Sequence, residues 1–305
     1  MFEEVTPNPY EGRPMSKSRD LSVLPNQSLS FKNRLINGAM QIWQRGTSST
    51  TSGVYGTADR WLQIGTSATW SQSTDVPTGF RHSMSVSGSN FVQIVQRIES
   101  LNCTDLVGET VTFSFWLKQT AGTGGIVAFL QYANTTDNFS AVTNVPNSIY
   151  SSTTSGSWVL YVFTVHNLPA QVANGLQFIV YANTSGAATF LLTGAQVEKG
   201  STATSFDYRP YGTELQLCQR YYWKPSQDPI GLAATGFGAG GRLNNPVPMR
   251  TAATISGATF SVNTGSAGTV TSIYQTVNGQ IVYNSANNWT TNASISVNGD
   301  VSAEL

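Results

Sequence analysis

This sequence has little charge and no long apolar run. Charged residues occupy 10% of the 305 positions, and the formal net charge is zero. Soluble proteins average about 25% charged residues. A chain without net charge presents no global field to nucleic-acid phosphates or to an anionic membrane. We therefore expect no nucleic-acid partner. We also expect no membrane insertion, since no stretch approaches the roughly 20 apolar residues of a membrane-spanning helix.

Signatures of catalysis and metal binding are also missing. The two histidines, His82 and His166, are isolated in the sequence. The common sequence motifs of catalytic nucleophiles, phosphate-binding loops and zinc sites do not occur, nor does Cys-x-x-Cys. GFGAGG at 236–241 matches G-x-G-x-x-G, but Asn-Asn-Pro follows at 244–246 where a helix should begin, so we interpret the match as chance. We expect no enzyme, no cofactor and no metal. A polysaccharide-degrading enzyme is the weaker interpretation, because the sparse carboxylates pick out no catalytic pair.

Cysteine is almost absent as well. Cys103 and Cys218 are far apart in the sequence and cannot form the disulfide framework of a small disulfide-rich domain. The spacing does not exclude a single disulfide between them, but two reduced thiols are the preferred interpretation. No apolar run near the start, MFEEVTPNPYEG, would serve as a signal peptide, so ordinary secretion is not expected.

What the sequence does contain is a series of short β patterns. Residues 111–118 alternate between apolar and other side chains with a period of two. WVLYVFTV at 158–165 is apolar on both faces, which predicts a strand in the middle of the sandwich. Further strands are expected at 35–45, 59–65, 68–74, 82–88, 92–99, 126–133, 176–182 and 189–198. This spacing predicts an all-β fold in which residues 34–210 form an antiparallel jelly-roll β-sandwich.

One segment, 211–225, carries a helical pattern. Thr213 is the expected N-cap, and Gln216 would complete a capping box. Leu215, Cys218, Tyr221 and Tyr222 fall on one stripe, and Pro225 ends the pattern. About eleven residues are too few for a stable isolated helix. We therefore expect a connecting helix held by the units on both sides.

Residues 226–305 predict a small C-terminal β domain. Val277-Asn278-Gly279-Gln280 is a strong hairpin signal, with Asn-Gly in a type I′ turn. The strands are short and rich in small residues, and a small core of this kind often gains stability by association.

The first 33 residues differ from the rest, since charges and prolines concentrate there without periodicity. Two interpretations stay open: a disordered tail, or an extended arm that becomes ordered on a partner. The docking side chains of such an arm would be Phe2, Tyr10, Leu21, Val23, Leu24, Leu29 and Phe31.

Aromatic side chains are the remaining candidates for ligand binding. A Trp or Tyr ring on a polar β surface stacks on a sugar ring through its apolar face. The alternative for each ring is packing in a core or a subunit contact. The candidate glycan-binding residues are Trp223, Tyr274, Tyr283, Trp289 and Trp116.

Three stretches carry a family resemblance. They are NRLINGAMQIWQRGTS with YGTADRWL (33–48 and 55–62), ETVTFSFWLKQ (109–119) and LTGAQVEKGSTATSFDYRPYGTELQLCQRYY (192–222). Together with VPMRTAAT (247–254) and SAEL (302–305), they resemble bacteriophage tail-fibre and related virion fibre proteins.

The resemblance implies a viral structural protein of the virion tail fibre, assembled in the cytoplasm of the host bacterium. Its sandwich would resemble a carbohydrate-binding module, and the chain would form a homotrimer. The N-terminal arm (1–33) would attach to a tail, baseplate or other virion protein. A distal C-terminal tip would face the host. The protein would display a surface that binds a host receptor, a glycan or a protein.

The resemblance also gives a role to the segment around the helix. An interdomain and trimer collar is expected from Asp207, Arg209, Leu215, Tyr221 and Tyr222. The alternative function is a structural adaptor, or a capsid or baseplate decoration protein, without receptor binding. The sequence leaves open the mount on the particle, the receptor and which β unit binds the host.

Overall fold

The computed structural model describes residues 31–305 apart from 90–91, 123, 155, 185, 226–227, 234–238, 263–269 and 285–292. Within this range the side chains of 183–184, 228–233, 239–242, 257–262, 270–275, 280–284 and 293–298 are also left undescribed. The contacts divide the chain into two units, Met1–Lys32 and Asn33–Leu305. All of the described strands and helices belong to the second unit.

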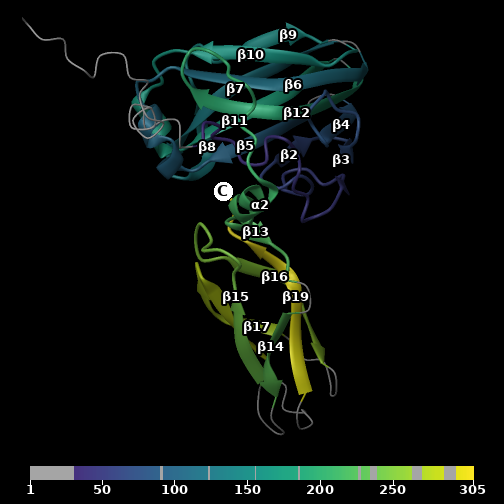
Figure 1. Ribbon diagram of the computed structural model, residues 1–305, viewed down its shortest axis with the longest axis vertical. Coiled ribbons are helices and arrows are strands. Elements are labelled where there is room, and N and C mark those ends of the chain that lie inside the picture. The colour runs from purple at the N-terminus through teal and green to yellow at the C-terminus, as the bar shows by residue number, and fades with distance from the viewer. Residues whose placement is uncertain are drawn as a thin grey trace, which may run out of the picture. The chain divides into compact units, whose positions relative to one another are not determined.

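Two antiparallel sheets form a β-sandwich (Figure 1). Its strands are β1 (Ser48–Ser49), β2 (Leu62–Gly65), β3 (Ala68–Ser73), β4 (Ser83–Ser89), β5 (Val92–Ile98), β6 (Val111–Ala121), β7 (Gly124–Thr135), β8 (Asn138–Asn144), β9 (Tyr150–Thr153), β10 (Val159–Val165), β11 (Leu176–Thr184) and β12 (Ala187–Lys199). Sheet A has the order β1-β3-β4-β12-β6-β10. Sheet B has the order β2-β5-β11-β7-β8, with β9 also paired to β7. Short 3-10 turns occupy Ser100–Asn102, Thr104–Leu106 and Ala170–Asn174.

The core lies between the two sheets and is rich in aromatic rings. Phe113 and Phe115 of β6 are fully buried, as the period-two pattern predicts. Their ring centroids lie 5.7 Å from that of Phe178 on β11, and Phe113 lies 4.8 Å from Phe163 on β10. Large buried rings supply much of the burial energy of such a core. The predicted jelly-roll β-sandwich is confirmed.

One predicted strand is in a different place. Segment 158–165 does form β10, but β10 is the last strand of sheet A and pairs only with β6 in the described chain. Leu160 and Val162 point away from the core and are each 43% exposed. The prediction of a central strand is therefore wrong. Apolar residues on both faces indicate burial on both faces only where another layer covers the outer face, and the described strands form no such layer over β10.

The expected strand at 35–45 is also wrong, because this segment is an irregular buried loop. Asn37 and Met40 have φ angles of 56° and 53°, which a strand cannot contain. The Asn37 side-chain amide donates to the carbonyls of Ile42 (2.9 Å) and Asp59 (3.0 Å). Its Oδ1 accepts from the backbone N–H groups of Gln41 and Ile42. Side chains thus replace the sheet ladder as partners of this backbone: Asn37 bonds several of its groups, and Gln96 and Asp59 accept from the N–H groups of Ile36 and Gln44.

The helix α2 (Tyr211–Gln219) is present but shorter than the predicted 211–225. The predicted N-cap is wrong: Pro210 occupies the N-cap position, where it makes no side-chain hydrogen bond, and Thr213 lies inside the helix. The proline fixes a φ of −53°, which suits entry into a helix. The N-cap position therefore lies three residues before Thr213. After Gln219 the chain turns into a short strand, β13 (Tyr222–Trp223).

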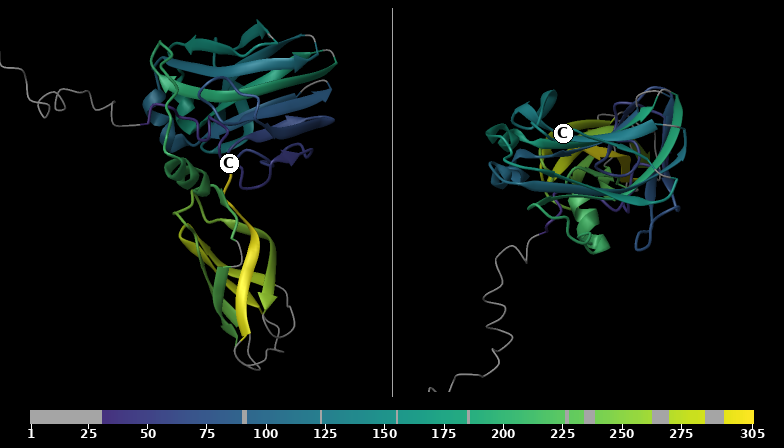
Figure 2. Two further views of the ribbon diagram at one scale, coloured as in Figure 1. Left: turned by 45° about the vertical axis from the view of Figure 1, so that its right-hand side comes forward. Right: turned by 90° about the horizontal axis from the view of Figure 1, so that it is seen from above.

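The C-terminal β region contains two further sheets (Figure 2). Its strands are β14 (Asp228–Ala233), β15 (Ala239–Asn244), β16 (Thr254–Val262), β17 (Val270–Thr276), β18 (Gly279–Asn284) and β19 (Ala293–Ser302). One sheet joins β13-β19-β14 with β16 on β19, and the other is β15-β18-β17.

The predicted β17–β18 hairpin is confirmed, but its turn is shifted by one residue. Thr276 pairs with Gly279, so Val277 and Asn278 make the turn in place of Asn278 and Gly279. Glycine is still required at 279, because an added Cβ would lie 2.5 Å from the Leu243 carbonyl oxygen of β15. The neighbouring strand, which local sequence does not reveal, sets this requirement.

Candidate functional site

A row of polar side chains crosses the outer face of sheet B. Strand pairing places Arg97 of β5 beside Gln177 of β11, Gln177 beside Gln131 of β7, and Gln131 beside Asn144 of β8. Gln177 Nε2 donates to Gln131 Oε1 at 2.6 Å, and Gln131 Nε2 donates to Asn144 Oδ1 at 2.8 Å. Arg97 Nε is 3.4 Å from Gln177 Oε1. With strands about 4.8 Å apart, four neighbouring strands place this row over roughly 14 Å.

An apolar row lies directly beside the polar one. Leu62, Val95, Ile179 and Phe129 are aligned on β2, β5, β11 and β7 by the strand register. Leu62, Val95 and Ile179 are at most 5% exposed although no third layer of described strands covers them. Phe129 and Tyr181 are only partly buried, and their rings meet edge to face with centroids 6.0 Å apart. The face therefore has a closed apolar floor with two accessible rings.

This arrangement suits a neutral polyhydroxylated ligand. Amide side chains both donate and accept hydrogen bonds, so they match hydroxyl groups of either polarity. The two accessible aromatic rings beside them offer surface of the kind that contacts the apolar face of a sugar ring. The row contains no carboxylate, and its single cation, Arg97, already donates through Nη1 to the Leu305 carbonyl. The described side chains of the row can recognise a ligand by shape and hydrogen bonding, and none of them is a carboxylate or an imidazole.

The sequence contains a signal for this face in the alternation along β11. Gln177, Ile179 and Tyr181 alternate with buried core residues along β11. Period two shows that they share the outer face. Which strands lie beside them follows only from the non-local order β2-β5-β11-β7-β8.

Trp116, one of the predicted glycan-binding residues, lies on the outer face of the other sheet. It is half-buried on β6 and pairs with Leu160 and Thr193. Its ring lies close to Gly194, where an added Cβ would approach Trp116 Cδ1 to 2.9 Å and the Phe80 ring to 2.6 Å. Trp116 is therefore separated from the rows on sheet B by the whole thickness of the sandwich.

The structure describes few of the other predicted site residues. Trp223 is 7% exposed and its Nε1–H donates to Asn245 Oδ1 at 3.0 Å, which leaves its ring little surface for a sugar. Tyr274 and Tyr283 lie on β17 and β18, but their side chains are outside the described set, as is Trp289 altogether. The predicted attachment residues Phe2, Tyr10, Leu21, Val23 and Leu24 also lie outside the described residues, with Leu29.

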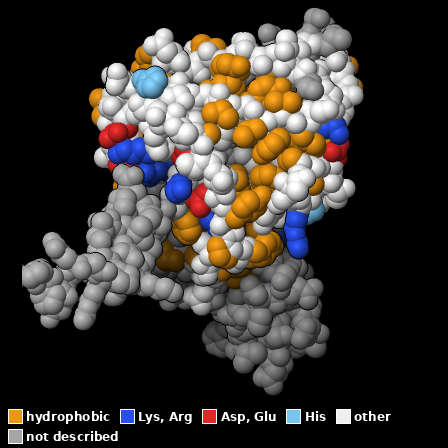
Figure 3. All heavy atoms as spheres, turned by 45° about the horizontal axis from the view of Figure 1, so that its top comes forward, with side chains coloured by type: hydrophobic (Ala, Val, Ile, Leu, Met, Phe, Trp, Pro, Cys, Tyr) orange, Lys and Arg blue, Asp and Glu red, His pale blue; other side chains and the backbone are white. Residues whose placement is uncertain are grey.

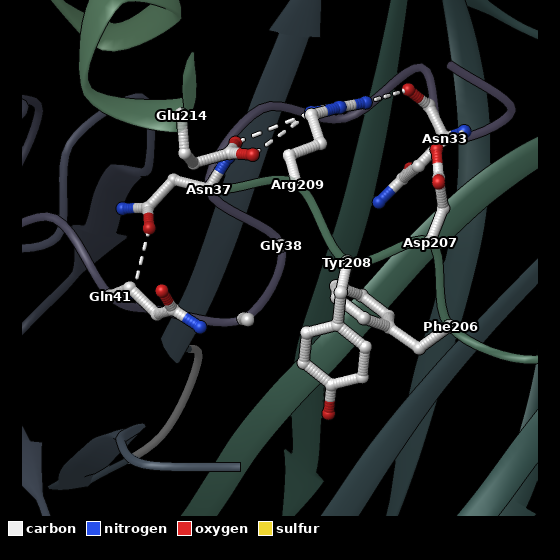
Figure 4. Close-up of a pocket in the computed structure, with 10 residues that line it drawn as sticks. Asn33, Asn37, Gly38, Gln41, Phe206, Asp207, Tyr208, Arg209 and Glu214 are labelled. Atoms are coloured by element: carbon white, nitrogen blue, oxygen red, sulfur yellow. Dashed lines mark hydrogen bonds and ion pairs between the residues drawn. The ribbon is translucent and has the colours of Figure 1, made fainter. Parts of the chain in front are cut away.

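The predicted collar residues Asp207 and Arg209 tie three segments together (Figure 4). Arg209 reaches between Glu214 of α2, at 3.2 Å, and the carbonyls of Asn33 and Leu35. The Asp207 carboxylate accepts from the Asn33 N–H at 3.2 Å, and the Asp207 N–H donates to Gln196 on β12. The cavity among these groups has a volume of about 10 Å³, which is room for one water and excludes an organic ligand. This part of the collar is a structural joint.

The remaining collar residues, Leu215, Tyr221 and Tyr222, do not share one environment. Leu215 is half-buried on α2. Tyr221 and Tyr222 are 1% and 3% exposed, and each carries an arginine on its ring: Arg60 Cζ lies 3.5 Å from the Tyr221 centroid and Arg45 Cζ 3.6 Å from that of Tyr222.

Glu304 joins the two arginines. It pairs with Arg45 at 2.8 Å and with Arg60 Nη1. Tyr55 donates to the Leu305 carbonyl at 3.2 Å, beside both guanidinium groups. We call Arg45, Arg60, Tyr221, Tyr222 and Glu304 the arginine–tyrosine joint. It connects the sandwich to the segment that follows β19, and the sequence offered no signal that paired Glu304 with either arginine.

Burial in and beside this joint shifts several pKa values. Desolvation raises the pKa of Asp59 to about 6, although Arg45, 3.8 Å away, and the hydrogen bonds from Gln44 act in the opposite direction. Burial also raises the pKa of Tyr221 to about 12, and it raises the pKa of Tyr222, whose hydroxyl donates to Asp300 at 2.7 Å. In each case desolvation is the largest cause, so these pKa shifts reflect a buried structural contact.

The described residues offer neither a metal cluster nor a membrane-spanning helix. No group of three or more His, Cys, Asp or Glu side chains in the described chain is placed to hold a metal ion. Among the same residues, no helix has the length and apolar character needed to cross a membrane.

Comparisons with known proteins find similarity only at the level of fold. No family model and no curated protein sequence matches the chain. A domain of bacteriophage CBA120 tailspike protein 4 is 15% identical with a TM-score of 0.39, over 55% of this chain and 21% of that one. The family 22 carbohydrate-binding module of Clostridium thermocellum Xyn10B is 15% identical with a TM-score of 0.38, over 50% and 92%. TmCBM61, solved with β-1,4-galactotriose, is 11% identical with a TM-score of 0.35, over 55% and 99%.

Proposed function

We propose that this protein is a non-catalytic structural component of a bacteriophage tail fibre, and that its sandwich binds a glycan of the host surface on the outer face of sheet B. The glycan part rests on one observation: a polar row of Arg97, Gln177, Gln131 and Asn144 runs beside an apolar row that ends in accessible aromatic rings. The ligand would be an uncharged saccharide, because amides dominate the polar row.

The virion part of the proposal rests on the sequence motifs at 33–62, 109–119 and 192–222, which resemble those of fibre proteins. In this proposal the chain is a homotrimer located in the virion and assembled in the bacterial cytoplasm. Its N-terminal residues attach to a tail or baseplate protein. Three weak glycan sites on one particle-bound trimer bind together more strongly than each does alone.

The binding face is tested by titrating the purified protein with oligosaccharides from the host envelope, using calorimetry. Tyr181→Ala removes a ring from the face, and Gln131→Met removes two hydrogen-bonding groups at nearly constant volume. Each is expected to weaken binding by roughly fivefold, since a lost stacking contact or hydrogen bond is worth about 1 kcal/mol. Tyr211→Ala, on the exposed start of α2, and Gln119→Met, near the end of β6, are matched controls that leave affinity unchanged.

The adaptor alternative predicts a different result with the same protein. A receptor-binding fibre adsorbs to host cells and competes with the phage for adsorption. A structural adaptor or decoration protein binds purified particles but neither host cells nor envelope glycan. The second outcome would overturn the glycan proposal while leaving the virion assignment standing.

A further inference from the structure

Exposed apolar side chains gather at one open edge of the sandwich. Of the twelve large hydrophobic residues that are exposed in the described chain, five lie on or beside β9 and β10. We call them the edge patch: Ile149, Tyr150, Val159, Leu160 and Val162, with exposed fractions from 36% to 59%. Single exposed hydrophobic residues are ordinary, whereas a gathered set marks an interaction surface.

Contacts on the core side of β10 hold the two strands together at this edge. β9 belongs to sheet B and β10 to sheet A, so the patch spans both layers at their open edge. Tyr161 Oη donates to the Thr153 carbonyl at 3.1 Å, and the rings of Tyr150 and Phe163 have centroids 3.7 Å apart. The edge is thus a built surface in which each strand positions the other.

The edge lacks the features that normally keep edge strands from associating. Natural edge strands carry charged side chains, prolines or bulges that discourage pairing. β10 reads VLYVFTV, contains none of these residues, and pairs with β6 without a register shift. Its second backbone edge has no strand partner in the described part of the chain.

The charge pattern indicates what kind of partner covers the edge. In a symmetric assembly, residues near the axis lie close to their own counterparts, so any charge there repels its copy. Residues 138–197, which include the whole patch, contain no Asp, Glu, Lys or Arg. Figure 3 shows a band of hydrophobic side chains in the sandwich, with charged side chains at its borders. Two charges outside this segment, Lys118 and Asp75, are paired with each other at 2.7 Å.

We propose that the edge patch is the surface through which copies of this chain meet, packed around their symmetry axis. Charges of opposite sign select an unlike partner, and an edge without charges, which carries no like-charge repulsion between copies, favours a second copy of this chain. The inference rests on the proposed function only for the number of copies, three. The contact itself follows from the edge and holds for any closed symmetric assembly.

The test measures the oligomeric state of the full chain by analytical ultracentrifugation. Leu160→Thr with Val162→Thr places β-branched side chains on the strand while replacing apolar surface by hydroxyl groups. We expect the wild type to be oligomeric. The dissociation constant of the double variant should be at least about 100-fold higher, which corresponds to about 2.8 kcal/mol of association free energy from two side chains in each copy. Leu101→Thr with Val107→Thr makes comparable changes at exposed positions outside the patch and should leave association unchanged. A monomeric wild type, or a double variant that associates like the wild type, overturns the inference.

Chemical cross-linking locates the contact independently. Both native cysteines, Cys103 and Cys218, are fully buried, so a short bismaleimide reacts only at an introduced thiol. Val162→Cys should give covalently linked copies and Val107→Cys should not; equal linking at both positions, or linking at 107 alone, contradicts the proposal.

Glycan affinity per chain, measured on the Leu160→Thr/Val162→Thr protein, should equal that of the wild type. Failure of the edge contact and failure of the glycan site are therefore separate results.

Discussion

The guanidinium carbon of Arg60 lies 3.5 Å from the centre of the Tyr221 ring, and both side chains are 1% exposed. Arg60 also donates through Nη2 to the Arg97 carbonyl at 2.7 Å, and its counter-charge is Glu304. A buried guanidinium is tolerated only where a ring, carbonyls and a carboxylate replace the water it has lost. Arg60 and Tyr221 therefore form the centre of the arginine–tyrosine joint, and Glu304 is its balancing charge.

Glu304→Gln is expected to lower the free energy of unfolding by about 3 kcal/mol. The substitution leaves the buried Arg60 without its carboxylate and the partly buried Arg45 with Asp59 alone. Removing one partner of a buried ion pair costs about 3–5 kcal/mol. Urea denaturation followed by tryptophan fluorescence measures the change. Glu109→Gln is the matched control, because its pair with Lys199 at 3.0 Å is exposed and should contribute less than about 1 kcal/mol. Equal losses in the two variants would contradict the role given to the joint.

Asp59 is expected to make stability depend on pH. Its pKa is raised from 3.8 to about 6 in the folded protein, mainly by desolvation. The stability that its protonated form contributes is therefore fully present below pH 3.8 and is lost as the pH rises through about 6. The loss amounts to at most about 3 kcal/mol, from a shift of roughly two pKa units.

The measurement compares unfolding free energies of the wild type and Asp59→Asn between about pH 4 and pH 8, a range that spans both pKa values of the carboxyl. The wild-type value should fall across this range, and the variant, which has no carboxyl to ionise at position 59, should lack this part of the fall. The difference between the two proteins should therefore shift in favour of the variant as the pH rises. Parallel pH profiles would show that Asp59 does not titrate as described.

The two cysteines should be unreactive in the native protein. Burial raises the pKa of Cys103 to about 12, and it raises that of Cys218 as well. Thiolates are the reactive form, so neither side chain has both access and nucleophilicity. Native protein is expected to react with a colorimetric thiol reagent only after denaturant is added, when two thiols per chain appear. Rapid reaction under native conditions would show that the fold opens at one of these positions.

Gly194 should not accept a side chain. Its φ is +61°, and an added Cβ would lie 2.6 Å from the Phe80 ring and 2.9 Å from Trp116. Gly194→Ala is expected to cost about 1–3 kcal/mol through backbone conformation and crowding. Gly212→Ala in α2 is the control, since nothing in the described chain lies within 4 Å of its added Cβ, and alanine favours the helix by up to about 1 kcal/mol. Thermal melting distinguishes the two: the first variant should melt lower and the second at least as high as the wild type.

Three wrong predictions about local structure have a common physical origin. The apolar pattern of 158–165 correctly predicts a strand, yet its place at the sheet edge depends on strand order, which local periodicity does not contain. The segment 35–45 has strand-like composition, and Asn37 diverts it into a loop by bonding its own neighbours and Asp59. Thr213 has the chemistry of an N-cap, but Pro210 starts the helix first. The strand order, the contacts of Asn37 and the position of Pro210 all lie outside the local pattern on which each prediction was based.

Sequence patterns were enough to predict the all-β class, the two β regions with a helix between them, and most strand positions, because side-chain alternation and turn residues act over a few neighbours. Three features became visible in the folded chain alone: which outer faces stay open, which polar side chains align across β5, β11, β7 and β8, and the pairing of Glu304 with Arg45 and Arg60. These features join residues that are distant along the chain. They exist only once the two sheets have closed on their core, so no local pattern encodes them.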